Sequence, residues 1–184
     1  MAENKLVGSL ILRTIDIDPT RNRPSINIDQ AYSNDYGITD ANGCYVIWKN
    51  VNIRTCIGEL YNKYDKYNLK MTTIQVRQNG TTGGTEDAQF IVYMSGLPFS
   101  NYNTSLGPNN GAALGCVNFN TTGTVGTTTA FTSGLVSFDK PLQDILNISI
   151  LLKNYSTISL NGYTETTASV LGHYSIICDI YGIE

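Results

Sequence analysis

The chain has 184 residues and a formal net charge of -3, and 15% of its residues are charged, against the roughly 25% typical of soluble domains. Its 12 lysines and arginines are scattered, so we expect no direct contact with nucleic acid, which is bound through clustered positive charge. No apolar stretch approaches the roughly 18 residues of a membrane-spanning helix, so we expect no membrane insertion.

The first half of the chain is predicted to form strands around one helix. Alternation of apolar and polar residues predicts strands at Leu6–Ile17, Cys44–Ile53, Asn68–Gln78 and Gln89–Leu97. The period changes over Thr55–Lys66, where apolar residues recur at spacings of three and four and define one helix face: Ile57, Leu60, Tyr61 and Tyr64. The hydroxyl of Thr55 is placed to cap the start of this short helix.

The second half of the chain is predicted to contain strands alone. The same alternation recurs at Ala112–Asn120, Leu135–Phe138, Asp144–Lys153 and His173–Ile183, and the Gly/Thr-rich segment Thr121–Thr129 is either a mobile tip or a weak strand. The connections are long, and no strand–helix–strand rhythm is present, which favours crossovers between two antiparallel sheets. We therefore expect residues 1–184 to form a single jelly-roll domain, an all-β sandwich with one short helix.

Reactive chemistry is sparse in this sequence. The single histidine, His173, lies at the rim of the last predicted strand, and no nucleophile or orienting partner can be assigned to it. No GxSxG elbow occurs, and the glycine-rich runs lack the Gly-Lys-Ser/Thr sequence that grips phosphates. We therefore interpret His173 as structural, and we expect a protein that is not an enzyme and uses no cofactor.

Metal binding and disulfides are also disfavoured. The four cysteines form no CxxC pair, and the first residues lack the pattern of a signal peptide, so we expect no export and no disulfides. We interpret the cysteines as small buried side chains: Cys44, Cys56, Cys116 and Cys178. Five aspartates between Asp16 and Asp40 offer oxygen ligands that suit Ca²⁺, but they lack the spacing of a calcium loop. Solvated turns are the favoured interpretation of those aspartates.

Tyrosine is abundant, with 12 residues, and it suits both protein interfaces and sugar-binding surfaces because it combines a large ring with a polar tip. Rings stack on sugars, and neighbouring asparagine amides bond to hydroxyls. A carbohydrate-binding β-sandwich is therefore the alternative function, with Tyr102 and Tyr163 as candidate glycan contacts.

A family resemblance rests on the order of five segments. These are a tryptophan-bearing strand, a tyrosine-rich helix, two further strands and the C-terminus: VIWKNVNIRT, GELYNKYDKYNLKM, QFIVYMSGLPF, VSFDKP and IICDIYGIE. From about Leu10 to its end, the chain resembles the small single jelly-roll capsid proteins of nucleocytoplasmic large double-stranded DNA viruses and their virophages. Those proteins act as penton or minor capsid subunits.

The resemblance implies a structural protein of the virion that works by self-association. It implies a homopentamer in contact with the major capsid protein, within a capsid assembled in the host cytoplasm, where unpaired cysteines are expected. It implies no catalytic residue. The absence of a basic arm before the first strand agrees with a shell subunit that does not touch the genome.

Overall fold

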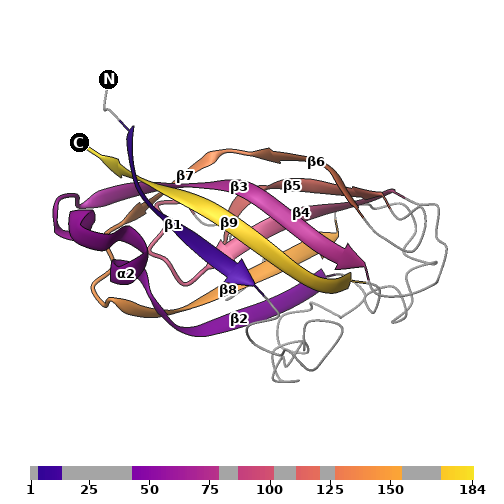
Figure 1. Ribbon diagram of the computed structural model, residues 1–184, viewed down its shortest axis with the longest axis horizontal. Helices are drawn as coiled ribbons and strands as arrows, with labels where there is room; N and C mark the ends of the chain where they lie inside the picture. The colour runs from indigo at the N-terminus through magenta and orange to yellow at the C-terminus, as the bar shows by residue number, and fades with distance from the viewer. Residues whose placement is uncertain (1–3, 14–42, 79–86, 102–110, 121–126, 155–170) are drawn as a thin grey trace.

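The computed structural model describes residues 4–13, 43–78, 87–101, 111–120, 127–154 and 171–184 (Figure 1). Side chains are described there except at strand ends 43–46, 76–78, 87–90, 118–120, 127–131, 153–154 and 171–174. The elements are β1 (Asn4–Arg13), β2 (Gly43–Asn52), α2 (Ile53–Ile57), the 3₁₀ helix η3 (Gly58–Asn62), β3 (Lys66–Gln78), β4 (Asp87–Ser95), β5 (Ala112–Asn120), β6 (Thr127–Ser133), β7 (Leu135–Asp139), β8 (Ile145–Asn154) and β9 (Leu171–Ile183).

The strands form two antiparallel sheets that pack into a sandwich. A four-stranded sheet has the order β1-β9-β3-β7, and a five-stranded sheet has the order β2-β8-β4-β5-β6. Figure 1 shows the two sheets as separate layers, with α2 at one end of the molecule. The prediction of a mostly β sandwich with one short helical segment is confirmed.

The strand order is that of a long hairpin rolled up on itself. Working inward from the two chain ends, β1 pairs with β9, β2 with β8, β3 with β7 and β4 with β5. These four pairs alternate between the sheets, and the roll is closed where β9 pairs with β3 and β8 pairs with β4. This is jelly-roll connectivity, with β6 as an added strand beside β5.

The core lies between the sheets and is built from the alternate residues that point inward. The ring of Tyr67 stacks on that of Phe138 with centroids 5.3 Å apart, and Phe99 meets Phe138 edge-on at 6.1 Å. The Tyr67 hydroxyl donates to the carbonyl of Tyr61 at 2.7 Å, which satisfies the polar tip of a buried ring. Further buried residues come from both sheets: Leu10, Leu12, Leu69, Met71, Val92, Met94, Ile148, Ile150, Ile176 and Ile180.

The two long sides of the sandwich differ. On one side Gly134 alone separates β6 from β7, so the chain passes directly from the five-stranded sheet to the four-stranded sheet. On the other side lie the edge strands β1 and β2. The indole nitrogen of Trp48 in β2 donates to the carbonyl of Arg13 in β1 at 3.1 Å, which links the two sheets there.

The predicted helix is shorter than expected and starts earlier. The expected span was Thr55–Lys66, but α2 covers Ile53–Ile57, η3 follows it to Asn62, and β3 begins at Lys66. Gly58, with φ of +74°, ends α2, because this conformation breaks the α-helical hydrogen-bond pattern and suits glycine. The predicted apolar face still holds, since Ile57, Tyr61 and Tyr64 are buried.

The structure also corrects two strand assignments. β6 spans Thr127–Ser133, most of which was not expected to be a strand, and it forms because β5 offers its edge to it. β1 runs from Asn4 to Arg13, and the rest of the predicted first strand lies outside the described residues. None of the helices among the described residues is long and apolar enough to cross a membrane.

Candidate contact site at the helical end

One end of the sandwich gathers the β2–β3 connection, which carries α2 and η3, and the β7–β8 connection at residues 140–144. In Figure 1, the start of β1 and the finish of β9 lie at this same end. Most strand ends that border undescribed connections lie at the opposite end, as the pairs Arg13–Ser175, Gln78–Leu171 and Asp87–Asn120 show. The exception is the β4–β5 connection, because β4 ends and β5 begins near the start of β8, at the helical end. Two of the connections at the helical end, β2–β3 and β7–β8, are described in full.

The start of α2 is fixed by two hydrogen bonds. The side-chain oxygen of Asn52 accepts from the backbone amide of Thr55 at 3.1 Å, so the cap is Asn52, and the predicted cap at Thr55 is wrong. The backbone amide of Ile53 donates to the carbonyl of Asp144 at 2.9 Å. This second bond joins the first turn of α2 to the β7–β8 connection.

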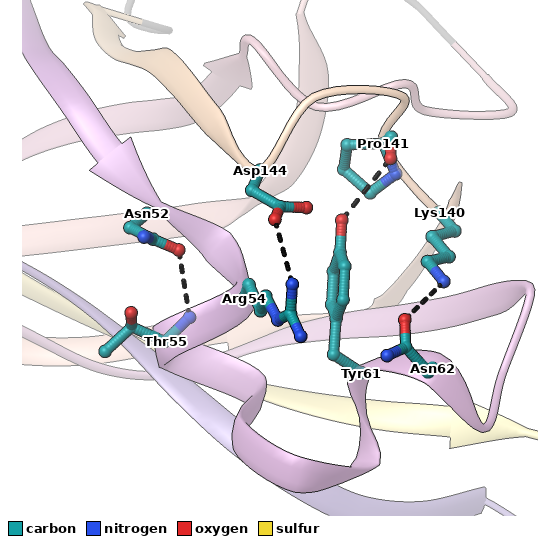
Figure 2. A network of polar contacts seen from close by, with 8 residues as sticks. All are labelled: Asn52, Arg54, Thr55, Tyr61, Asn62, Lys140, Pro141 and Asp144. Atoms are coloured by element: carbon teal, nitrogen blue, oxygen red, sulfur yellow. Dashed lines mark hydrogen bonds and ion pairs between the residues drawn. The ribbon is translucent and has the colours of Figure 1, made fainter.

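Further contacts hold the β7–β8 connection against the helical segment (Figure 2). The hydroxyl of Tyr61 donates to the carbonyl of Pro141 at 3.3 Å, and the Arg54 guanidinium lies 3.5 Å from the Asp144 carboxylate. Both side chains of that ion pair are about half exposed, so the pair adds little stability and mainly orients the turn.

Lys140 anchors the other side of the same turn. Its backbone amide donates to the carbonyl of Asp65 at 2.8 Å, and its ammonium donates to the side-chain oxygen of Asn62 at 3.0 Å. The ammonium also lies 4.8 Å from the centre of the Tyr61 ring, within range of a cation–π interaction. The turn is thus attached to α2, η3 and the start of β3.

This anchored turn presents an apolar side chain to solvent. Leu142 is fully exposed, and Ile145, at the start of β8, is 54% exposed. Burying a leucine side chain gains about 1.5–3 kcal/mol, and a side chain on a turn that is already held in place loses less entropy when a partner covers it. We call Leu142 and Ile145 the apolar tip.

Three ionisable groups of the helical segment and the residue that follows it have raised pKa values. Burial, followed by the nearby Asp144 carboxylate, raises the pKa of Tyr61. Burial likewise raises the pKa of the Cys56 thiol, which disfavours the reactive thiolate. The hydrogen bond to Glu184 raises the pKa of Lys63, which therefore keeps its charge. The exposed apolar side chains make this end suited to contact with another surface.

The residues singled out from the sequence are not brought together by the described structure. Tyr102, Tyr163 and the aspartates between Asp16 and Asp40 lie outside the described residues. His173 is placed in β9, but its side chain is not described. Within the described ranges, no three His, Cys, Asp or Glu residues are grouped to hold a metal ion. Cys178 is buried, Cys56 and Cys116 are partly buried, and all three are free.

Sequence reasoning missed the apolar tip. The sequence Lys140-Pro141-Leu142 predicts only the end of a strand, because proline stops β pairing. The available signal was a leucine in a short polar connection, where an apolar residue has no core to join.

No protein-family model and no curated protein sequence matches this chain.

Proposed function

We propose that this chain is a structural subunit of a viral capsid, acting as a vertex (penton) or minor capsid protein through self-association and contact with the major capsid protein. The observation that carries the proposal is the jelly-roll connectivity, in which four nested strand pairs alternate between two sheets. Capsid subunits are among the proteins built on this topology, together with lectin domains and cupins.

The surface favours the capsid function over the other uses of the fold. The described surface offers an exposed leucine on an anchored turn. That feature matches a protein contact, in which a rigid apolar side chain fills a depression on a neighbour.

A five-fold ring needs a heterologous contact, in which one surface of each subunit meets a different surface of the next. The apolar tip supplies one of those two surfaces. The low content of charged residues supports a body that neighbours surround, because buried charge is costly unless it is paired. The place of action in this proposal is the virion, with assembly in the host cytoplasm and no direct contact with the genome.

The test is to express the chain with and without the major capsid protein of its own virus. Native mass spectrometry should detect pentamers, and cryo-electron microscopy should place the chain at the vertices or among the minor positions of the shell. Leu142→Asp should reduce incorporation into particles, because a carboxylate would be buried at the contact. Leu135→Asp, at another exposed leucine, is the matched control and should assemble normally. A protein that stays monomeric and is absent from particles would refute the proposal.

A further inference from the structure

β1 is attached to the edge of the four-stranded sheet as a separable strand. Among the described strands, β9 is its ladder partner, from Asn4 to Arg13 (Figure 1). The rest of that sheet does not depend on it, because β9 pairs with β3 and β3 pairs with β7. The sheet therefore keeps its other ladders whichever molecule supplies β1.

The apolar contacts of β1 are specific for its sequence. Leu10 and Leu12 are buried in the core between the two sheets. Two residues before Leu10, the backbone of α2 lies so close to Gly8 that a Cβ atom there would overlap the carbonyl oxygen of Cys56. A strand that takes this place needs a glycine and two large apolar residues at these positions, and β1 of another copy of this chain has them.

Polar contacts fix the C-terminal half of β1 on two sides. The Ser9 hydroxyl donates to the carboxylate of Asp179 in β9 at 3.1 Å. The indole nitrogen of Trp48 in β2 donates to the carbonyl of Arg13 at 3.1 Å. We call β9, α2 and Trp48 together the acceptor surface, since these elements hold β1 in place.

The connection from β1 to β2 is far longer than its ends require. β1 ends beside β2, where the Arg13 carbonyl meets Trp48, yet residues 14–42, 29 in all, separate the two strands in the sequence. Fully extended, a chain of that length spans roughly 95 Å, about three times the length of β1. It is long enough to let β1 reach the acceptor surface of an adjacent molecule.

We propose that β1 is exchanged between subunits, so that β1 of one chain occupies the acceptor surface of the next copy. The contacts of Gly8, Ser9, Leu10, Leu12 and Arg13 are then made between two chains with the same partners as within one. Exchange loses none of these contacts, which makes it a ready route to oligomers. The proposal deepens the proposed function and rests on the self-association stated there.

Exchange gives each subunit two different contact surfaces, with β1 as the donor and the acceptor surface as the receiver. A closed ring is built from a heterologous contact of this kind, repeated in one direction. Ten residues of β1 form the ladder, so this contact is more extensive than the apolar tip alone. The two contacts use different parts of the molecule and can act together in one ring.

Local concentration decides which copy of β1 fills the acceptor surface. A tether of 29 residues holds the chain's own β1 at an effective concentration on the order of millimolar. A dilute solution therefore favours the chain's own strand, whereas subunits packed in a ring present β1 to one another at a comparable concentration. Exchange should increase with protein concentration and be greatest in assembled rings.

Cysteines placed on two separate proteins test the exchange. Ile11 in β1 pairs with Ile177 in β9. Residues paired in this way have Cα atoms about 4.5–5.5 Å apart, within the range for a disulfide. Full-length Ile11→Cys and Ile177→Cys are unfolded together, refolded at concentrations up to the millimolar range and mildly oxidised. Because neither protein carries both changes, a disulfide between positions 11 and 177 can form only between chains.

We expect the mixture to give covalent dimers on a denaturing, non-reducing gel, in an amount that increases with protein concentration. Each variant oxidised alone is the control for the native cysteines and should not give this product. The link between positions 11 and 177 is identified by mass spectrometry of the digested dimer. Its absence at every concentration would overturn the proposal.

Lys70→Cys and Leu135→Cys form the matched control pair. The two residues are exposed and pair across β3 and β7 of the same sheet, and both strands stay within one chain when β1 is exchanged. Their mixture should give no link between chains, whereas the double variant should form a disulfide within one chain, which shows that a ladder pair in this sheet can be bonded. Equal linkage in the two mixtures would contradict strand exchange.

Assembly assays separate this proposal from the proposed function. Pentamers of mixed Ile11→Cys and Ile177→Cys subunits that stay unlinked after oxidation would exclude strand exchange and leave the capsid function standing. Linked chains that never enter particles would support strand exchange and refute the capsid function. A chain that does not associate at any concentration would refute both.

Discussion

At the scale of single residues, Gly8 shows how closely the helical segment meets the sheet. A Cβ atom at this position would overlap the carbonyl oxygen of Cys56 and come within 3.0 Å of the Cα of Ile57. Both neighbours are backbone atoms of α2, which cannot move aside as a flexible side chain could. Glycine is required here for space, because no other residue lets α2 approach β1 as closely.

Gly8→Ala should therefore lower the free energy of unfolding by about 1–3 kcal/mol, the usual cost of overpacking a tight contact. The control is Gly134→Ala, since a Cβ at Gly134 meets no atom within 4 Å, and it should change stability by less than about 0.5 kcal/mol. Urea unfolding of the two variants measures the difference. Equal stabilities would mean that α2 can shift away from β1.

The buried thiol of Cys178 makes stability depend on alkaline pH. Burial, followed by the charge of Asp179, raises its pKa from 9.0 to about 12 in the folded chain. The folded state thus holds a proton that the unfolded state releases above pH 9, so the stabilisation is complete below pH 9 and is lost as the pH rises toward 12. Burial also raises the pKa of Tyr67 from 10.0 to about 12, which adds a loss above pH 10.

We predict that the free energy of unfolding falls between pH 9 and pH 10 and that Cys178→Ala reduces this fall. The remaining decrease comes from other groups, including the half-buried Cys56, whose pKa burial also raises. Denaturant unfolding at closely spaced pH values provides the measurement. An unchanged slope in Cys178→Ala would show that the thiol ionises as easily in the folded chain as in the unfolded one.

At the scale of elements, the helical segment joins the core to the β7–β8 turn within ten residues. Ile53 and Ile57 point into the core, Arg54 meets the β7–β8 turn, and Tyr61 supports Pro141. An isolated helix this short is not stable in water, so its position depends on its cap and on these contacts. The cap is therefore coupled to the geometry of the apolar tip.

Asn52→Ala should destabilise the chain by about 1 kcal/mol, because the Thr55 amide loses its acceptor at the start of α2. Thr55→Ala is the matched control: its backbone amide still reaches Asn52, so the loss should be smaller. Thermal unfolding distinguishes the two variants. A larger loss of stability in Thr55→Ala than in Asn52→Ala would indicate that the threonine hydroxyl caps α2.

At the scale of the whole molecule, the rolled-up hairpin ties together residues that are far apart in sequence. Asn4 pairs with Ile183, and Gly43 pairs with Lys153. Both sheets contribute to one core, and Trp48 bridges them through the Arg13 carbonyl. Long-range pairing of this kind predicts slow folding and a cooperative native state.

Trp48 is the single tryptophan, so its fluorescence reports the junction of the two sheets. We predict that fluorescence and far-ultraviolet circular dichroism give the same unfolding midpoint, because neither sheet has a separate core to keep it folded. Two separate midpoints would mean that the sheets unfold independently. Trp48→Phe, followed by circular dichroism alone, checks the contribution of the bridge to stability.

Strand positions were predictable because alternation is a local property of the chain. β5 was predicted with its observed bounds from its recurring apolar residues, although a register shift against β4 lets both Leu114 and Val117 be buried. β6 was not, because its segment TTTAFTS carries one strongly apolar residue, and pairing with β5 makes it a strand. The apolar tip was also beyond prediction, since sequence does not show which leucine lacks a core to enter.

The sequence by itself determined the β-rich composition, the strand periods and the buried face of the helical segment, because each depends on residues within a few positions of one another. Tertiary structure alone decided that Asn52 caps α2 and that Leu142 remains in solvent on an anchored turn. These features depend on which distant strands meet. That choice is made by the burial of both sheets against a common core, and no local pattern encodes it.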